Sequence, residues 1–161
     1  MKIFKPDVAV NRIFDLDLNI LKKNNIKGIV FDIDNTLAFN KEPEPSCEIE
    51  AYMNMLLKEG FKVAIASNNT EERVTIYSNK LNMDFEYRAA KPLGYKVRRL
   101  IKRMGLKRKQ VCLVGDQLFT DMLGANMMGL FSVLVVPFDG DENSFIGFKR
   151  KIEKIIMKRW K

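Results

Sequence analysis

Short apolar stretches alternate with amphipathic stretches along most of the chain, and this alternation constrains the fold more than any other feature. The apolar stretches are short and rich in β-branched residues, which is typical of buried strands. They predict five strands, at residues 27–32, 61–67, 85–89, 111–114 and 131–136. The amphipathic stretches predict helices at residues 18–24, 46–60, 71–81, 93–104 and 120–127. We therefore expect an α/β fold, a three-layer Rossmann-like domain with a central five-stranded, mainly parallel sheet.

The first predicted strand runs directly into two carboxylates. The stretch GIVFDIDNTL places Asp32 and Asp34 two residues apart, with Thr36 two further on. An acidic turn after a strand is the simplest alternative, because Asp and Asn are common turn residues. The acids would, however, lie at the carboxyl end of the strand, where open parallel sheets bind their ligands.

Three other predicted strands also end in polar residues. Ser67 and Asn68 end the second strand, and Lys91 follows the third. Asp116 follows the fourth strand, with Asp121 five residues later. Each group could be a cap or a solvated loop on its own. Because the carboxyl ends of parallel strands share one edge of the sheet, we expect these groups to converge.

Three converging carboxylates need a counter-charge. Two like charges about 4 Å apart repel by roughly 4 kcal/mol at an effective dielectric of 20. A hard divalent cation such as Mg²⁺ would relieve the repulsion among Asp32, Asp34 and Asp116. Lys91 and the Ser67 hydroxyl add a cation and a donor, a combination that suits a phosphoryl group.

Composition narrows the chemistry further. The 161 residues contain no histidine, which excludes a Ser-His-Asp triad and a histidine-based zinc site. Cys47 and Cys112 lie in settings that indicate neither a disulfide framework nor a metal site, so we expect a reducing, cytoplasmic environment. No transmembrane segment or secretory signal is expected. The net charge of +8 favours an anionic partner.

The four polar strand ends, in this order, resemble the motifs of the haloacid dehalogenase-like (HAD) phosphatases over about residues 26–137. The resemblance implies that Asp32 is the nucleophile and that Asp34 is the general acid and base. It implies that Ser67, Asn68 and Lys91 bind the phosphate. It also implies that Asp32, the main-chain carbonyl of Asp34, and Asp116 ligate Mg²⁺, with Thr36 and Asp121 in supporting positions.

The closer resemblance is to the capless subgroup IIIA and, within it, to the YqeG-like proteins related to mitochondrial phosphatidylglycerophosphate phosphatase. The shared features are the DxDNTL motif, the preceding Asn-Ile-Lys-Gly, the GDQLxTD motif and the short basic tail. The segments between the motifs are too short for a cap domain. An open site of this kind suits a membrane-embedded substrate, and the relatives imply that this is phosphatidylglycerophosphate.

The whole chain is expected to be a single domain, residues 1–161, with a basic amphipathic helix at about 143–160. That helix holds its charges in solvent if it packs on the sheet, or makes peripheral contact with anionic lipid at the inner face of the membrane. Residues 96–109 form a second basic segment, with eight cations and no acid. Two other functions stay open: a phosphatase of nucleic-acid ends or nucleotides, and a receiver-like signalling module with Asp32 as phosphoacceptor. The near absence of aromatic residues in the basic segments makes nucleic acid the weaker partner.

Overall fold

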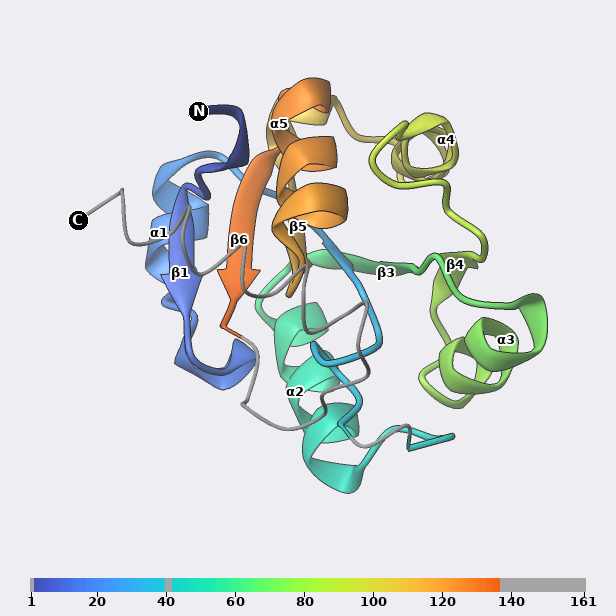
Figure 1. The fold of residues 1–161 in the computed structure, drawn as a ribbon. Helices are drawn as coiled ribbons and strands as arrows, with labels where there is room; N and C mark the ends of the chain where they lie inside the picture. Colours follow the sequence, from blue (N-terminus) through green and yellow to red (C-terminus); the bar gives the residue numbers. More distant parts are fainter. Residues whose placement is uncertain (1, 40–41, 137–161) are drawn as a thin grey trace.

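The computed structural model describes residues 2–39 and 42–136, and all its strands belong to one parallel sheet. The strand order across the sheet is β1-β6-β5-β2-β3-β4 (Figure 1). The strands are β1 (Val8–Val10), β2 (Gly28–Phe31), β3 (Lys62–Ala66), β4 (Asp84–Glu86), β5 (Val111–Gly115) and β6 (Phe131–Val135).

The sheet has six strands in place of the five predicted. The additional strand, β1, pairs with β6 through Val8 and Val133. It has only three residues, which is shorter than the stretch in which alternation can be recognised in a sequence. The strand predicted at residues 85–89 is shorter and lies earlier in the chain, as β4 at Asp84–Glu86.

Helices cover both faces of the sheet, which confirms the three-layer α/β architecture (Figure 1). The helices are α1 (Leu18–Lys23), α2 (Cys47–Lys58), α3 (Glu71–Lys80), α4 (Tyr95–Arg103) and α5 (Leu123–Met128). Ile29 and Phe31 of β2 pack in the same core cluster as buried side chains of α1, α2 and α3. Val30 lies in a second cluster with side chains of α4 and α5. Alternate residues of one strand therefore serve opposite faces.

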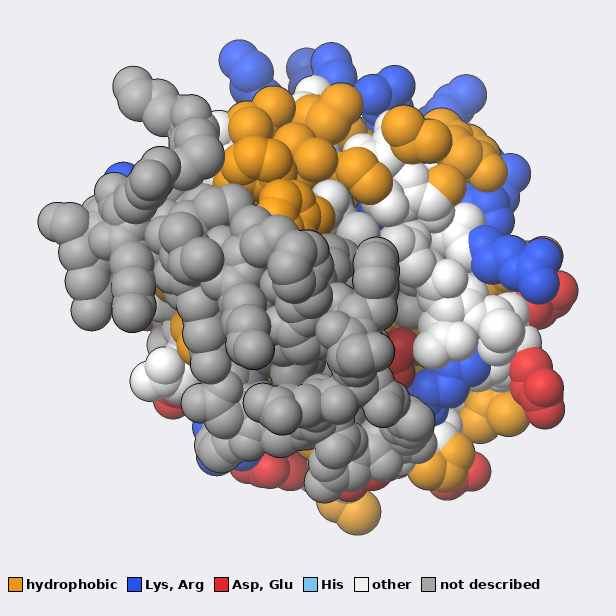
Figure 2. All heavy atoms as spheres, viewed as in Figure 1, with side chains coloured by type: hydrophobic (Ala, Val, Ile, Leu, Met, Phe, Trp, Pro, Cys, Tyr) orange, Lys and Arg blue, Asp and Glu red, His pale blue; other side chains and the backbone are white. Residues whose placement is uncertain are grey.

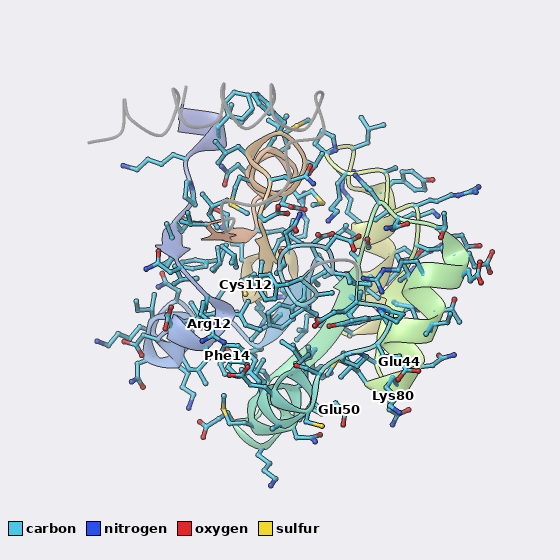
Figure 3. All side chains as sticks on the ribbon, turned by 60° about the horizontal axis from the view of Figure 1, so that its bottom comes forward. Arg12, Phe14, Glu44, Glu50, Lys80 and Cys112 are labelled. Atoms are coloured by element: carbon cyan, nitrogen blue, oxygen red, sulfur yellow. The ribbon has the colours of Figure 1, made fainter. Side chains whose placement is uncertain are left out.

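Both cysteines are free thiols. Cys112 lies inside the molecule and belongs to the core cluster that includes side chains of α2 (Figure 3). Cys47 is exposed at the start of α2. The expectation that these two residues form no disulfide is therefore confirmed.

The order of the strands places β2 at the centre, between β5 and β3. The chain leaves β2 to build β3 on one side and returns to build β5 on the other. Phe31 at the end of β2 is in register with Ile65 of β3 and Val114 of β5. The three strands thus end together, at the kind of switch point where parallel sheets form a crevice.

The connections after β2 and β3 are short. Among the described residues, the connection from β2 to β3 contains α2, and the connection from β3 to β4 contains α3. Glu44 and Lys80 point toward each other and link these two connections through an ion pair of 3.9 Å (Figure 3). The described part of the chain therefore contains no cap domain, as predicted.

Within residues 2–39 and 42–136, no helix has both the length and the apolar character required to cross a bilayer. The basic helix predicted at residues 143–160 lies outside the described residues and stays a prediction.

Candidate active site

A pocket of about 330 Å³ lies at the carboxyl ends of the central strands and contains most of the predicted site residues. Its lining consists of Asp32, Asp34, Ser67, Asn68, Asn69, Lys91, Gln117, Thr120 and Asp121. The expected convergence of residues from four strand ends is therefore observed. Thr36 and Asp116 are not part of the lining. Thr36 is fully buried in the turn after Asp34, and Asp116 is buried directly after β5.

The turn after β2 directs both acids of the first motif toward this edge. The Asp32 amide still donates to the Val114 carbonyl, 2.9 Å away, so sheet pairing continues one residue beyond β2. Ile33 points into the core, which leaves Asp32 and Asp34 on the other side of the chain. Asn35 adopts a positive φ of 59°, a conformation that Asn tolerates well, and its amide donates to the Ala38 carbonyl.

Lys91 lies between two buried carboxylates. Its Nζ atom donates to Asp32 Oδ1 at 2.7 Å and to Asp121 Oδ1 at 2.6 Å. Burial opposes the charge on Lys91, but the carboxylates of Asp121 and Asp32 outweigh this effect and raise its pKa. Burial raises the pKa of Asp32 to about 7, although Lys91 acts in the opposite direction. Asp32 and Lys91 therefore form a hydrogen-bonded pair that is nearly inaccessible to solvent.

Asn68 holds the backbone of Lys91 in place. Its Oδ1 accepts from the Lys91 amide at 3.0 Å, and its Nδ2 donates to the Lys91 carbonyl at 3.2 Å. The Ser67 hydroxyl accepts from the Asn69 amide at 3.2 Å. The end of β3 is thereby connected to the segment that carries the buried lysine.

Asp121 reaches the site because Gly115 has no side chain. A Cβ atom at position 115 would lie 2.3 Å from Asp121 Cγ, a separation that atoms cannot adopt. Asp121 lies within the π-helical turn Leu118–Met122, and its Oδ2 accepts a hydrogen bond from the Gln117 amide at 3.1 Å. Glycine at the end of β5 thus allows the carboxylate of Asp121 to approach Lys91.

Asp32, Asp116 and Asp121 form a group that could hold a metal ion. All three are buried, and one ligand oxygen from each lies within 4.8 Å of the others. Lys91 offsets one of the three negative charges when all the carboxylates are ionised. The donor set is thus suited to a hard cation. Asp121 belongs to this group by position, whereas the side chain of Asp34 does not.

The carboxylate of Asp34 instead contacts two residues that the sequence reasoning did not assign to the site. Asn69 Nδ2 donates to Asp34 Oδ2 at 2.9 Å, and Arg73 Nη2 donates to Asp34 Oδ1 at 3.2 Å. One signal for Arg73 was present in the sequence. A cation in the first turn of a helix is unfavourable next to the positive end of the helix dipole, so it indicates a specific partner.

The chain is similar to known phosphatases over almost all of its length. It is 38% identical to the probable phosphatase YqeG of Bacillus subtilis over 156 residues, which cover 97% of this chain and 91% of that protein. It is 28% identical to phosphatidylglycerophosphate phosphatase 1, chloroplastic/mitochondrial, of Arabidopsis thaliana. That match covers 96% of this chain but only 47% of the plant protein.

A solved structure and a family model agree with these similarities. The fold matches a putative HAD superfamily (subfamily III A) hydrolase from Legionella pneumophila with a TM-score of 0.55 and 22% identity, over 75% of this chain and 76% of the other. The model of the family described as mitochondrial PGP phosphatase matches residues 1–137. The chain therefore belongs to the mitochondrial PGP phosphatase family and is a phosphatase with a HAD-like fold.

Proposed function

We propose that the protein removes the terminal phosphate of phosphatidylglycerophosphate through an aspartyl-phosphate formed on Asp32. The observation that carries this proposal is the buried contact between Asp32 and Lys91, which both line the pocket at the carboxyl edge of the sheet. Membership of a family that contains phosphatidylglycerophosphate phosphatases supports the choice of substrate. The family assignment decides against the receiver-module alternative, since the chain is an enzyme.

The residues of the pocket suit a two-step displacement. In the first step, a carboxylate oxygen of Asp32 forms a bond to phosphorus, the bond to the glycerol oxygen breaks, and Asp34 gives its proton to that oxygen. In the second step, water attacks the phosphorus and Asp34 takes a proton from the water. The bond between phosphorus and the Asp32 oxygen breaks, which frees inorganic phosphate and restores Asp32. Asp34 is half-exposed at the pocket, where both the leaving oxygen and the water can reach it.

Three residues are assigned to the phosphoryl oxygens. Lys91 supplies the positive charge, and the Ser67 hydroxyl supplies a donor. The amide side chain of Asn68 is already bonded to the backbone of Lys91, so we assign its phosphate contact to its main-chain N–H. Thr36 supports the site only through the turn in which it is buried.

We propose Mg²⁺ as the metal, held by Asp32, Asp116 and the main-chain carbonyl of Asp34. Hard oxygen donors and a phosphorylated substrate are the combination that Mg²⁺ prefers. When bound, the ion would neutralise charge on the phosphoryl group and favour the ionised form of Asp32. Asp121, which contacts Lys91, is placed in support of this group.

Contact with a membrane surface is also part of the proposal. Hydrophobic side chains gather over α4 and α5, with Lys and Arg side chains beside them (Figure 2). Leu93 and Tyr95, two and four residues after the buried lysine, are 69% and 56% exposed. Apolar side chains beside cations suit the interface of an anionic bilayer. Such a surface near Lys91 would place the pocket close to the lipid head group.

A phosphate-release assay with Mg²⁺ tests the proposal. Equal concentrations of phosphatidylglycerophosphate in mixed vesicles, 5′-phosphorylated oligonucleotides and glycerol 3-phosphate would be compared by kcat/KM. We expect the lipid to be the best substrate, by about tenfold or more. A higher kcat/KM for the oligonucleotides would transfer the function to nucleic-acid ends, and the two basic segments would then be its binding surface.

A further inference from the structure

The side chain of Asp34 is held at both of its oxygens by residues that follow β3. Asn69 lies in the loop before α3 and donates to Oδ2 at 2.9 Å. Arg73 lies in the first turn of α3 and donates to Oδ1 at 3.2 Å. The side chain of Asp34 is 36% exposed, so core packing alone does not restrict its rotation. These two hydrogen bonds are therefore what fixes the direction of the carboxylate.

Arg73 is itself restricted by burial and by the ring of Tyr77. Its side chain is only 16% exposed, and its guanidinium lies over the ring of Tyr77, 5.5 Å from the centroid. Tyr77 is fully buried, one helical turn further along α3. A stacked and largely buried arginine has few alternative positions. It can therefore hold the carboxylate of Asp34 in a fixed position relative to α3.

We infer that Arg73 is a positioning residue for the proton transfer made by Asp34. The inference rests on the role of Asp34 in the proposed function. Arg73 does not line the pocket, so we assign its effect to its contact with Asp34. Each carboxylate oxygen has two lone-pair sites, so Asp34 can carry a proton while it accepts these hydrogen bonds. When that proton passes to the leaving oxygen, Asp34 becomes a carboxylate, and the guanidinium of Arg73 is already hydrogen-bonded to it.

Position matters in this step because general acid catalysis needs the donor within hydrogen-bond reach of the leaving oxygen. A displacement of about 1 Å can reduce the rate by about 100-fold. The loss depends on the leaving group. An alkoxide leaves only with a proton, whereas p-nitrophenolate is a stable anion and needs little protonation. A defect confined to Asp34 positioning would thus affect alkyl phosphates more than aryl phosphates.

The test uses two substrates of nearly equal size, p-nitrobenzyl phosphate and p-nitrophenyl phosphate. The kcat/KM of each is measured by phosphate release in the presence of Mg²⁺, on the same preparation of full-length protein. For Arg73→Gln, we expect the ratio of benzyl to phenyl activity to fall by about tenfold or more relative to the parent protein. Arg73→Lys keeps the charge and one donor and should recover part of the ratio. Arg12→Gln changes an exposed arginine that pairs with Glu48 of α2, outside the pocket and the basic segments, and should leave the ratio unchanged.

The ratio does not depend on how much of a preparation is folded, because both substrates meet the same active molecules. Equal losses with both substrates in Arg73→Gln and Arg73→Lys, or no loss in either, would overturn the inference. Asp34→Asn is measured alongside to separate the two proposals. If Asp34→Asn retains full activity with p-nitrobenzyl phosphate, the proposed role of Asp34 fails. If it loses that activity while both Arg73 variants keep the parent ratio, only the role of Arg73 fails.

Discussion

Lys91 Nζ donates to Asp32 Oδ1 across 2.7 Å, and the side chains of the two residues are only 2% and 9% exposed. Two charged groups are rarely buried to this extent unless each compensates the other. In this protein, both also line the pocket where the phosphate is proposed to bind. The pair therefore affects both the stability of the site and the proposed reaction.

The first prediction concerns Asp32. Asp32→Asn keeps the size of the side chain but removes the nucleophilic oxygen, so hydrolysis of p-nitrophenyl phosphate should fall by about 10³-fold or more. Turnover and circular dichroism would be measured on the same samples. Asp84→Asn, which alters an exposed carboxylate at the start of β4, serves as the matched control and should keep its activity. Retained turnover in Asp32→Asn would remove this residue from the nucleophile role.

The second prediction concerns the counter-charge of the buried acids. Lys91→Met leaves Asp32, Asp116 and Asp121 without the cation that contacts two of them, and should cost about 3–5 kcal/mol of stability in the absence of metal. Because a divalent cation can take the place of that charge, Mg²⁺ should raise the melting temperature of this variant more than that of the parent protein.

Thermal melting in EDTA and in excess Mg²⁺ measures both effects. Lys96→Met is the control, because the ammonium of Lys96 donates to the Tyr87 carbonyl rather than to an acid. An equal Mg²⁺-induced shift in all three proteins would mean that Lys91 and the metal do not share the carboxylates.

The third prediction concerns membrane contact. Replacing Leu93 and Tyr95 together by Ser removes exposed apolar side chains, so the fold should be unaffected. Binding to vesicles that contain anionic lipid should weaken by about tenfold or more, since each buried side chain of this size contributes about 1.5–3 kcal/mol. Vesicle sedimentation and hydrolysis of p-nitrophenyl phosphate report the two properties separately. Leu57→Ser on α2, which is 48% exposed, is the control. Unchanged sedimentation of the double variant would exclude this surface.

The fourth prediction concerns the ion-pair cluster beside β4. Arg99 and Arg103 donate to the buried carboxylate of Glu86 at distances between 2.6 and 2.9 Å. Burial alone would raise the pKa of Glu86, but the hydrogen bonds from the two arginines outweigh it and lower the pKa below its ordinary value of 4.5. A lowered pKa means that the contribution to stability is complete above pH 4.5 and is lost as the pH falls through the folded-state value.

Glu86→Gln should therefore lower the free energy of unfolding by about 1–3 kcal/mol at neutral pH, and by progressively less in acid. Urea unfolding at neutral pH and at several values below 4.5 gives this difference. Glu71→Gln, exposed in the first turn of α3, provides the comparison and should change stability little at any pH. A Glu86→Gln deficit that does not shrink in acid would mean that packing, rather than charge, accounts for it.

Local sequence was sufficient to predict the individual parts of the site. Asp32, Ser67, Lys91 and Asp116 each follow an apolar strand, and strand ends are recognisable from a few neighbouring residues. Parallel pairing then requires these ends to meet at one edge of the sheet, so the pocket could be expected before any distance was known. Ser46 and Thr70 likewise cap the helices that follow them, because capping depends on residues three positions away.

Tertiary structure decided which side chains contact one another. The pairs Lys91–Asp121 and Arg73–Asp34 are separated by 30 and 39 residues, and each contact depends on strand register and helix placement. The strand Val8–Val10 forms only because Val133 is available beside it, 125 residues later. The sequence by itself therefore determined the chemical groups at the sheet edge, since these follow from local pattern. The partners of each group were decided by the fold, because long-range packing sets distances that no local stretch contains.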